Sequence, residues 1–533
     1  MKFTRRSFIQ SSILTGASLL LNPINRLTEF SKGSLFGVNP FILRNPRAVF
    51  IMKTNVDIKT NFSACKKAGL DFGRSVFGLT DNPDEGVSLT NKIIIKPNLT
   101  CRQRERDIYT WRGSMGIVTD AYFVEGIIES IKELSIPEEQ FYIREVNCPA
   151  DLRDGGYEAM AERTRINIRG INTPVWQLPP DLVQWTSVPE GKFFKMIPYL
   201  WPVNASNTFL INIAKFKAHS MGLTLCAKNL QGTIAMNYQA HCTRYGDVMT
   251  GVSQDHLSLT AHEDILENYN RHLKKGIPRW DKPGEDGGLW QETWATRCLD
   301  NNSATPAGIH IIEGIYGRDG NFLDGPDPQG LATDYMTNYI IFGKNQFYVD
   351  IIGHYLGGHE PGNFGLFHMA RERHMISTFN PWDIQVYEWD TTNGPVLKDL
   401  TTFNRFPLKT LYLQRNYNGY DEPKWHMVDE PFDYSVVGIN DQTIDSNSFN
   451  ICQNYPNPVQ SKTTVSFYIP ANGHVNVEIL NSNGQLFDRL VDKPITYGDH
   501  TIILDCNEYP SGYYFCQIRY CGLSKTIKMV VLH

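Results

Sequence analysis

The chain has 533 residues, of which 41% are hydrophobic and 20% are charged, and its formal net charge is -5. These values are typical of a globular protein, and the length predicts two or more domains. The slightly negative net charge does not indicate nucleic-acid binding. No apolar stretch of about 18 residues or more follows the N-terminal region. We therefore expect no nucleic-acid partner and no membrane span in the mature chain.

Residues 1–32 are predicted to be a signal peptide. Arg5 and Arg6 precede a short apolar region from Ile13 to Leu21, and this order is typical of an export signal. The paired arginines, with Phe8 two positions further on, resemble a twin-arginine signal. That resemblance implies that the twin-arginine machinery exports the folded protein to the periplasm. The alternative is an ordinary secretory signal with incidental arginines.

Residues 40–430 are predicted to form an α/β core with a mostly parallel sheet. Short apolar runs alternate with segments of helical spacing, which is the pattern of strands connected by helices. The predicted strands are 48–52, 92–96, 141–146, 209–214, 308–315 and 339–342, and the predicted helices are 61–77, 121–134, 156–165 and 346–356. Residues 243–305 are polar and too long for a plain connection, so we expect an inserted lid or small subdomain there.

The C-terminal region, residues 453–533, is predicted to be an all-β sandwich that follows a linker at 434–452. Turn residues separate short alternating runs, which favour a small sandwich. The predicted strands are 463–469, 474–480, 485–491, 500–505, 512–520 and 524–532. Four motifs occur in order here: Gln453 to Pro458 (QNYPNP), Gly473 to Gly484 (GHVNVEILNSNG), Pro510 to Phe515 (PSGYYF) and a terminal Lys525 to His533 (KTIKMVVLH).

These C-terminal motifs resemble the type A sorting domain of the type IX secretion system. The resemblance implies that the type IX machinery is a partner and that the protein is secreted or attached to the outer cell surface. A carbohydrate-binding or immunoglobulin-like appendage is the alternative. Among the ten cysteines no two are spaced C-x-x-C, which argues against a ferredoxin-type cluster and a zinc ribbon. Cys506, Cys516 and Cys521 are close enough in sequence for one disulfide, and most other cysteines are expected to be free, buried thiols.

The stretch from Phe209 to Met236 is the centre of the predicted site. Its strand is expected to end near Ala214 and to lead through Lys215, Lys217 and His219 into a helix. A helix N-terminus presents free N–H groups and a positive dipole end, so the neighbouring lysines predict an anion-binding site. The unperturbed pKa of a histidine side chain lies near neutrality, so His219 is the predicted proton-transfer group.

Other strand ends add candidates, because ligands of open α/β sheets bind beyond the carboxyl ends of the strands. Lys96 and Asn98 follow one strand, and Glu145 ends the next, with Asn147 as a crevice residue or a turn cap. The alternative for each lysine is a solvated surface side chain. A metal site formed by His219, His241 and a carboxylate is conceivable, but the spacing matches no metal motif, and we predict none.

The glycine-rich loop from Glu313 to Gly320 follows another strand. It lacks the spacing of phosphate-binding or dinucleotide-binding loops, but Glu313 and Asp319 are candidate bases. Asp350 and His354 are four residues apart, so they share one helix face and form either a structural or a catalytic pair.

The order of several short motifs resembles the domain of unknown function 362 family over about residues 45–400. These motifs are Lys96-Pro97-Asn98, Asn212 through His219, Lys228 through Gly232, Glu313-Gly314, Gly320 with Gly325-Pro326, and Asp350. Some relatives carry ferredoxin-type iron–sulfur segments, which implies redox work in them. This chain departs from that pattern because it has no C-x-x-C.

We therefore predict a secreted or surface-attached α/β enzyme that acts on an anionic small molecule or glycan. The predicted anion-binding residues are Lys96, Asn98, Lys215, Lys217, Lys228 and Asn229, and the predicted catalytic residues are His219, Glu313, Asp319 and Asp350. The sequence leaves two alternatives open, a non-enzymatic surface binding protein and a metal-dependent oxidoreductase, and it names no cofactor.

Overall fold

A computed structural model describes most of the chain beyond the predicted signal peptide. The described residues are 33–100, 113–146, 149–223, 225–238, 245, 252–280, 287–413, 416–417, 420–421, 423–434, 450–451, 453–469, 473–482, 484–495, 498–520 and 523–533. The predicted signal peptide, Asn147, His241, Cys521 and nearly all of the predicted linker lie outside these residues. The chain divides into two compact units, Met1–Met369 with Phe379–Phe432, and Asp433–His533 with Ala370–Thr378.

The first unit is organised around a ten-stranded mixed sheet with the order β15-β14-β2-β13-β12-β10-β5-β6-β7, in which β11 pairs with β10. Five neighbouring strands, β12, β10, β5, β6 and β7, run parallel, and β13 runs antiparallel to β12. The strands are β2 (Val49–Lys53), β5 (Lys92–Pro97), β6 (Phe141–Glu145), β7 (Asn167–Gly170), β10 (Thr208–His219), β11 (Gly222–Leu223), β12 (Ile309–Arg318), β13 (Asp334–Gly343), β14 (Val386–Asp390) and β15 (Gly394–Lys398). The predicted α/β class with a mostly parallel sheet is confirmed.

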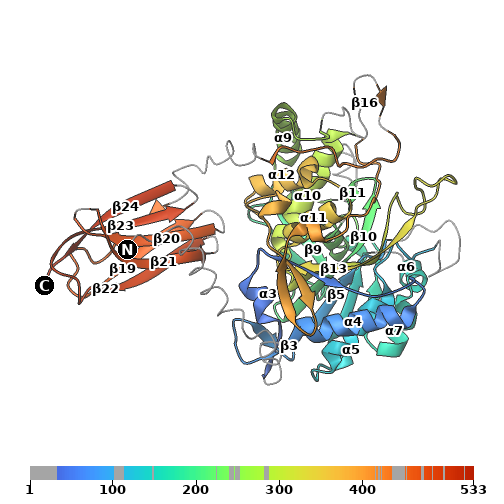
Figure 1. Cartoon of the computed structure of the whole chain (residues 1–533), viewed down its shortest axis with the longest axis horizontal. Helices are drawn as coiled ribbons and strands as arrows, with labels where there is room; N and C mark the ends of the chain where they lie inside the picture. Colours follow the sequence, from blue (N-terminus) through green and yellow to red (C-terminus); the bar gives the residue numbers. More distant parts are fainter. Residues whose placement is uncertain are drawn as a thin grey trace, which may run out of the picture. The chain divides into compact units, whose positions relative to one another are not determined.

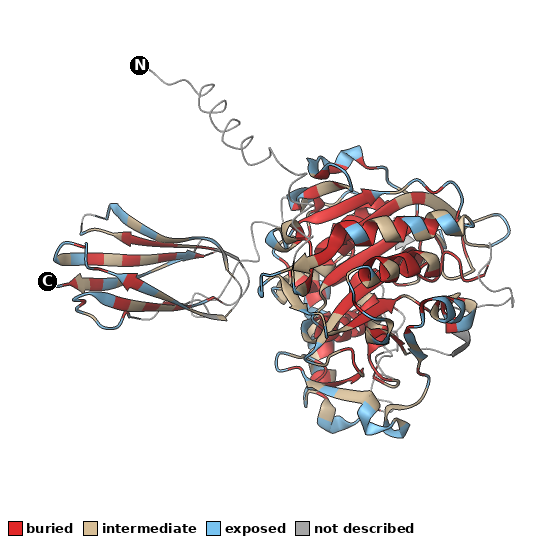
Figure 2. Ribbon diagram, turned by 90° about the horizontal axis from the view of Figure 1, so that it is seen from below, coloured by how far each residue is buried: buried red, intermediate tan, exposed pale blue. Residues whose placement is uncertain are grey.

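Helices cover both faces of this sheet. The first layer is α4 (Phe62–Val76), α5 (Ala121–Lys132) and α7 (Tyr157–Thr164), and the second is α8 (Cys226–Asn229), α9 (Ala261–Lys275), α10 (Gly288–Ala304) and α11 (Gln346–Leu356). Figure 1 shows the two layers on opposite sides of the central strands, and Figure 2 shows those strands buried between them. Successive residues of β5 pack against different helix layers. Ile93 and Ile95 pack with α4 and α5, whereas Ile94 belongs to a separate core beneath the second layer.

Smaller elements surround the sheet. They are a three-stranded sheet of β1 (Leu35–Val38), β3 (Phe77–Thr80) and β4 (Gly86–Ser88), the hairpin β8 (Val183–Ser187) and β9 (Met196–Leu200), the hairpin β16 (Asn416–Tyr417) and β17 (Tyr420–Asp421), and the helices α3 (Pro40–Arg44), α6 (Pro149–Asp154) and α12 (Gly365–Glu372). No helix of the described ranges is long and apolar enough to cross a membrane.

The strand β10 is longer than the sequence indicates, which changes the setting of the predicted site. It runs to His219 because its ladder with β12 continues past a register shift to the pair Lys217–Arg318, and its end then pairs with β11. The helix that follows, α8, begins only at Cys226 and has four residues. The predicted end of the strand near Ala214 is therefore wrong.

The region predicted as an insertion or lid contains α9 and α10. Helix α10 is buried over most of its length, including polar residues such as Gln291 and Glu292. Trp280 and Trp294 are also buried. Helix α10 therefore belongs to the interior of the unit, whereas α9 has an exposed side, and the function of this region as a lid stays a prediction.

The second unit contains a β-sandwich. One sheet has the order β18-β19-β22 and the other β21-β20-β23-β24, and both contribute apolar side chains to one core. The strands are β18 (Asn450–Ile451), β19 (Lys462–Ile469), β20 (Gly473–Leu480), β21 (Leu486–Ile495), β22 (Gly498–Asp505), β23 (Gly512–Tyr520) and β24 (Leu523–Val531). The predicted sandwich is confirmed. Cys506 and Cys516 are both free and buried, so these two do not form the disulfide that their spacing permits.

Candidate functional site

Lys96, at the end of β5, is neutralised inside the protein. Its Nζ donates to Glu145 Oε2 at 2.5 Å, to the Pro97 carbonyl at 2.6 Å and to Asn229 Oδ1 at 3.3 Å. Burial lowers the pKa of Lys96 and raises the pKa of Glu145, and the opposite charge of each partner opposes both changes. The positive charge of Lys96 therefore neutralises the negative charge of Glu145, and the Lys96 ammonium donates three hydrogen bonds within the protein.

A chain of amides extends from this ion pair across the sheet. Asn229 Nδ2 donates to the Lys96 carbonyl at 3.0 Å and to Asn212 Oδ1 at 2.8 Å. Asn212 Nδ2 in turn lies 2.9 Å from the Cys226 carbonyl and 3.0 Å from His310 Nδ1. Burial lowers the pKa of His310 to about 3, so its ring is neutral at physiological pH. Asn229 thus ties α8 to β5 and β10.

Lys228, next to Asn229 in α8, is half-buried and makes no ion pair with the residues that the structure describes. The positive charge of Lys228 adds to the lowering of the Lys96 pKa, and it opposes the increase that burial causes in the Glu145 pKa. Among the described residues, the Lys96 ammonium has Glu145 as an internal carboxylate partner, whereas no such partner is found for Lys228.

Lys215 forms a second buried ion pair. Its Nζ donates to Glu313 Oε2 at 2.7 Å and lies 3.4 Å from the centre of the Tyr316 ring. Glu313 also accepts the backbone N–H of Asp120 at 3.0 Å and that of Ile315 at 3.1 Å. Both charged side chains are 0% exposed, and burial raises the pKa of Glu313 while Lys215 opposes that increase. Glu313 is thus a partner for Lys215 within the protein interior.

The two ion pairs lie on opposite faces of the sheet. Lys96 is in register with Asn212 and lies two residues after Ile94, which belongs to the core beneath the second layer. Ile211 and Ile213, on either side of Asn212, both belong to the core beneath the first layer. Lys215 follows Ile213 on the face that packs against α5, where Asp120 caps the helix. Because side chains of a strand alternate between faces, Lys96 and Lys215 do not line one crevice, contrary to the prediction.

Asp350 occupies the helix N-terminus that was predicted to hold a ligand anion. Its carboxylate accepts the N–H groups of Cys226 at 2.7 Å and Ala227 at 2.8 Å. Burial raises the pKa of Asp350 to about 7, and these two hydrogen bonds oppose the increase. His354, on the same helix, contacts the Leu223 carbonyl through Nε2 at 3.1 Å. Asp350 and His354 therefore both hold the segment from β11 to α8.

Asn98 holds a loop against β10. Its N–H donates to Thr119 Oγ1 at 2.9 Å, and its Nδ2 donates to the Ile117 carbonyl at 2.9 Å. Thr119 Oγ1 then donates to the Ile213 carbonyl at 2.9 Å. Asn98 is half-buried, and these bonds place it in the connection between β5 and α5.

The outer end of β10 carries Lys217, which is buried at 4% exposure like the interior lysines, and His219, which is half-buried. The Lys217 ammonium lies 5.2 Å from the centre of the Phe322 ring, and the His219 ring lies 5.3 Å from the same ring. His219 and Ser220 are half-buried, and His219 Nδ1 accepts the Met221 N–H at 3.2 Å. The Ser220 hydroxyl also lies 3.2 Å from that nitrogen. Lys217 and His219 are therefore brought together around one aromatic ring.

Asp319 lies at the start of the loop that carries Phe322. Its carboxylate accepts the Thr333 N–H at 2.7 Å and the Tyr335 hydroxyl at 3.2 Å. Burial raises the pKa of Asp319 to about 6, against the effect of these hydrogen bonds. The base of the loop is fixed by Arg318, which donates from Nε and Nη2 to the two oxygens of Asp334 at 2.6 and 2.9 Å.

Sequence reasoning missed Asp120, Asn212 and Phe322. Asp120 accepts the N–H groups of Tyr122 and Phe123 as the N-cap of α5, and an acidic residue just before an apolar helical pattern was a usable signal. Asn212 was visible as a single polar residue within an apolar strand. Phe322 had no signal, because its contacts with β10 arise only in the folded loop.

Two further observations concern cavities and metals. The described residues include no group of three His, Cys, Asp or Glu placed to hold a metal ion.

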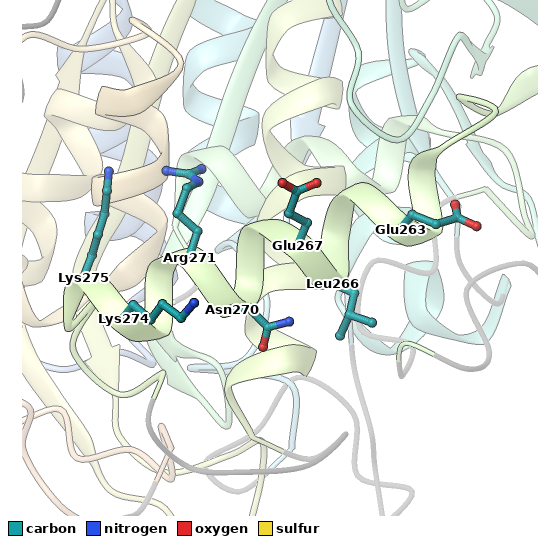
Figure 3. A pocket seen from close by; sticks show the side chains of 7 residues that line it. All are labelled: Glu263, Leu266, Glu267, Asn270, Arg271, Lys274 and Lys275. Atoms are coloured by element: carbon teal, nitrogen blue, oxygen red, sulfur yellow. The ribbon is translucent and has the colours of Figure 1, made fainter.

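A surface hollow lies along α9, and none of the predicted site residues lines it (Figure 3). Its lining residues are Glu263, Leu266, Glu267, Asn270, Arg271, Lys274 and Lys275.

Comparison with known proteins identifies two parts of the chain. Residues 93–354 match the family described as Domain of unknown function (DUF362), and residues 453–532 match the Secretion system C-terminal sorting domain. These matches confirm the predicted domain content. The sorting domain indicates a type IX secretion substrate that is secreted or located at the cell surface.

Other comparisons add little. No curated protein matches the chain. Among solved structures, it is similar to PorZ of Porphyromonas gingivalis, described as an essential bacterial surface component of the type-IX secretion system. The identity is 18%, the TM-score is 0.13, and the similarity covers 18% of this chain and 13% of that chain. A similarity of this size carries no argument about fold or function.

Proposed function

We propose that this secreted or surface-attached protein binds an anionic small molecule, or an anionic group of a glycan, at the outer end of β10 and acts on it as an enzyme. The supporting observation is the pair Lys217 and His219, which both pack against Phe322 where β10 ends. Ligands of open α/β sheets bind beyond the carboxyl ends of strands, and this end carries a cation and a titratable ring together.

The proposal assigns different tasks to the predicted residues. Lys217 supplies positive charge, His219 transfers a proton, and Asp319, with a pKa raised to about 6, is the carboxyl group suited to acid–base exchange near neutral pH. The ion pairs Lys96–Glu145 and Lys215–Glu313 keep the strand ends in place. Before type IX secretion, the folded chain crosses to the periplasm by the twin-arginine route that Arg5 and Arg6 indicate.

Ligand-induced thermal stabilisation tests the position of the site. All ten tryptophans precede residue 453, so tryptophan fluorescence reports on the α/β unit alone. We expect inorganic phosphate or glucuronate to raise the melting temperature of the full chain, because a ligand that binds only the folded state stabilises it. Lys217→Met should remove the shift, and the exposed Lys195→Met is the matched control. A shift that survives in Lys217→Met places the anion site elsewhere.

Turnover separates an enzyme from a binding protein. A ligand that stabilises the wild type is incubated with it, and products are followed by mass spectrometry. We expect His219→Ala to lose turnover while it keeps the ligand-induced shift, because Lys217 remains. Binding without any reaction in the wild type would favour the alternative of a non-enzymatic surface binding protein.

A further inference from the structure

Helix α9 carries an apolar edge on its solvent-facing side. Leu266 is 42% exposed and Leu273 is 39% exposed, and Leu259, just before the helix, is 89% exposed. These three leucines are spaced seven residues apart, so the two within α9 lie on nearly the same side of the helix. Such a row of large apolar side chains, continued by a surface hollow that Leu266 lines, is typical of a docking surface.

The opposite side of α9 fixes its position in the fold. Tyr269 and His272 are buried, and His272 Nδ1 lies 2.7 Å from Glu292 Oε2 on α10. The same carboxylate oxygen accepts the Trp280 indole N–H at 2.8 Å. The exposed side of α9 is therefore presented on a helix that the interior holds rigidly.

Charge is distributed along the exposed side with opposite signs at its two ends. Glu263 and Glu267 lie in the N-terminal half, and Arg271, Lys274 and Lys275 lie in the C-terminal half. All five are exposed, and Asn270 lies between the two groups. Figure 3 shows these side chains projecting from the one helix, with the acidic residues toward one end and the basic residues toward the other.

We propose that α9 is the contact surface of a homodimer, in which α9 packs antiparallel against α9 of a second copy of this chain. A two-fold axis that crosses the exposed side of α9 level with position 269, next to Asn270, places Glu267 opposite Arg271 of the second copy and Glu263 opposite its Lys274. The same axis brings Leu266 next to Leu273 of the second copy, so the four leucines lie together along one side of the pair. This proposal is independent of the proposed function.

The pattern favours a second copy over other occupants. A membrane-binding helix carries mainly basic residues on its polar face, whereas α9 carries both signs in separate halves. An isologous interface requires a surface that is complementary to itself after a half turn, and acidic and basic halves around a neutral centre meet that requirement. One helix pair buries less surface than a standard interface, so we expect a dissociation constant of about 1 to 10 μM.

Charge reversal with reciprocal rescue tests the dimer. We expect sedimentation velocity of the full chain at about 1 to 100 μM to show a monomer–dimer equilibrium. A basic variant, Glu263→Lys with Glu267→Lys, and an acidic variant, Arg271→Glu with Lys274→Glu, should each associate about tenfold or more weakly, because both place like charges opposite each other. An equimolar mixture of the two should recover association as a heterodimer.

Controls distinguish the interface from a folding defect. The exchanged residues are exposed, so each variant should melt within a few degrees of the wild type, as followed by tryptophan fluorescence. Leu266→Ser should weaken the dimer about threefold or more without changing its charge dependence. A wild type that stays monomeric at the highest concentration, charge variants that dimerise like the wild type, or a mixture that does not associate would overturn the proposal.

Discussion

The inner and outer parts of β10 carry similar residues but differ in what surrounds them. In the inner part, Asn212 and Lys215 are fully buried, and their polar atoms meet partners from the protein itself. In the outer part, Lys217 and His219 share an aromatic neighbour, and His219 is partly open to solvent. A lysine at the end of a strand is therefore not by itself evidence for a ligand site, because an internal carboxylate can be its partner, as Glu313 is for Lys215.

The inner part also shows why the internal partners are needed. Removing a lysine from water is costly, and a carboxylate in hydrogen-bond contact repays part of that cost. Glu313 does this for Lys215, and Glu145 does it for Lys96 on the other face of the sheet. The two pairs thus allow charged side chains at the centre of an apolar sheet, which is a structural role.

The largest effect is expected from removing the counter-charge of Lys215. Glu313→Gln keeps only one of the two oxygens that accept the N–H groups of Asp120 and Ile315, and it leaves the Lys215 ammonium without its charged partner. We expect the free energy of unfolding to fall by about 3 kcal/mol or more, because removing one partner of a buried ion pair leaves the other charge buried without a counter-charge. Urea unfolding followed by tryptophan fluorescence measures this loss in the α/β unit.

The matched control for this prediction removes both charges. Lys215→Met with Glu313→Gln should recover at least half of the lost free energy, because no charge is then left buried. A single variant that loses less than about 1 kcal/mol would show that the pair contributes little and that the inner and outer parts of β10 differ less than the structure indicates.

A smaller effect, and one that depends on pH, is expected at Asp319. Its folded pKa of about 6 exceeds the ordinary value of 3.8, so the folded protein binds this proton more tightly than the unfolded chain does. The contribution to stability is complete below the unfolded pKa and is lost as pH rises through about 6. Asp319→Asn cannot titrate, so the variant should gain up to about 3 kcal/mol relative to the wild type between pH 3.5 and 7.

Urea unfolding at several pH values checks this prediction. The comparison must be the difference between wild type and variant at each pH, because burial also raises the pKa of Glu145, Glu313 and Asp350. These groups titrate equally in both proteins and cancel in the difference. A difference that stays constant from pH 3.5 to 7 would contradict the raised pKa of Asp319.

Local patterns of apolar and polar residues in the sequence were enough to predict most of the architecture. Six of the seven sandwich strands, all except β18, and helix α11 follow from alternation and helical spacing, since these periods depend only on neighbouring residues. The end of β10 could not be predicted in this way. Its extension to His219 depends on pairing with two other strands. One of them, β12, is distant in sequence, and the other, β11, forms only after the turn that follows His219.

The candidate site was predicted less well than the fold for a related reason. The residue types at the strand ends were identified, but the partner of each charge was not. Glu145 and Glu313 lie 49 and 98 residues from the lysines they neutralise, and nothing local links them. The face on which each lysine lies required the register of β5 against β10. Positive charge was therefore visible in the sequence, whereas its neutralisation was not.

The smallest effect on stability is expected at His219, and it tests the outer part of β10 directly. His219→Ala removes the acceptor of the Met221 N–H and a ring contact with Phe322. Because the ring is only half-buried, water can replace the lost hydrogen bond, and we expect a loss of about 1 kcal/mol or less. The same urea experiment provides the measurement. A loss as large as that of Glu313→Gln would mean that His219 is a structural residue of the interior, and the distinction between the two parts of β10 would then fail.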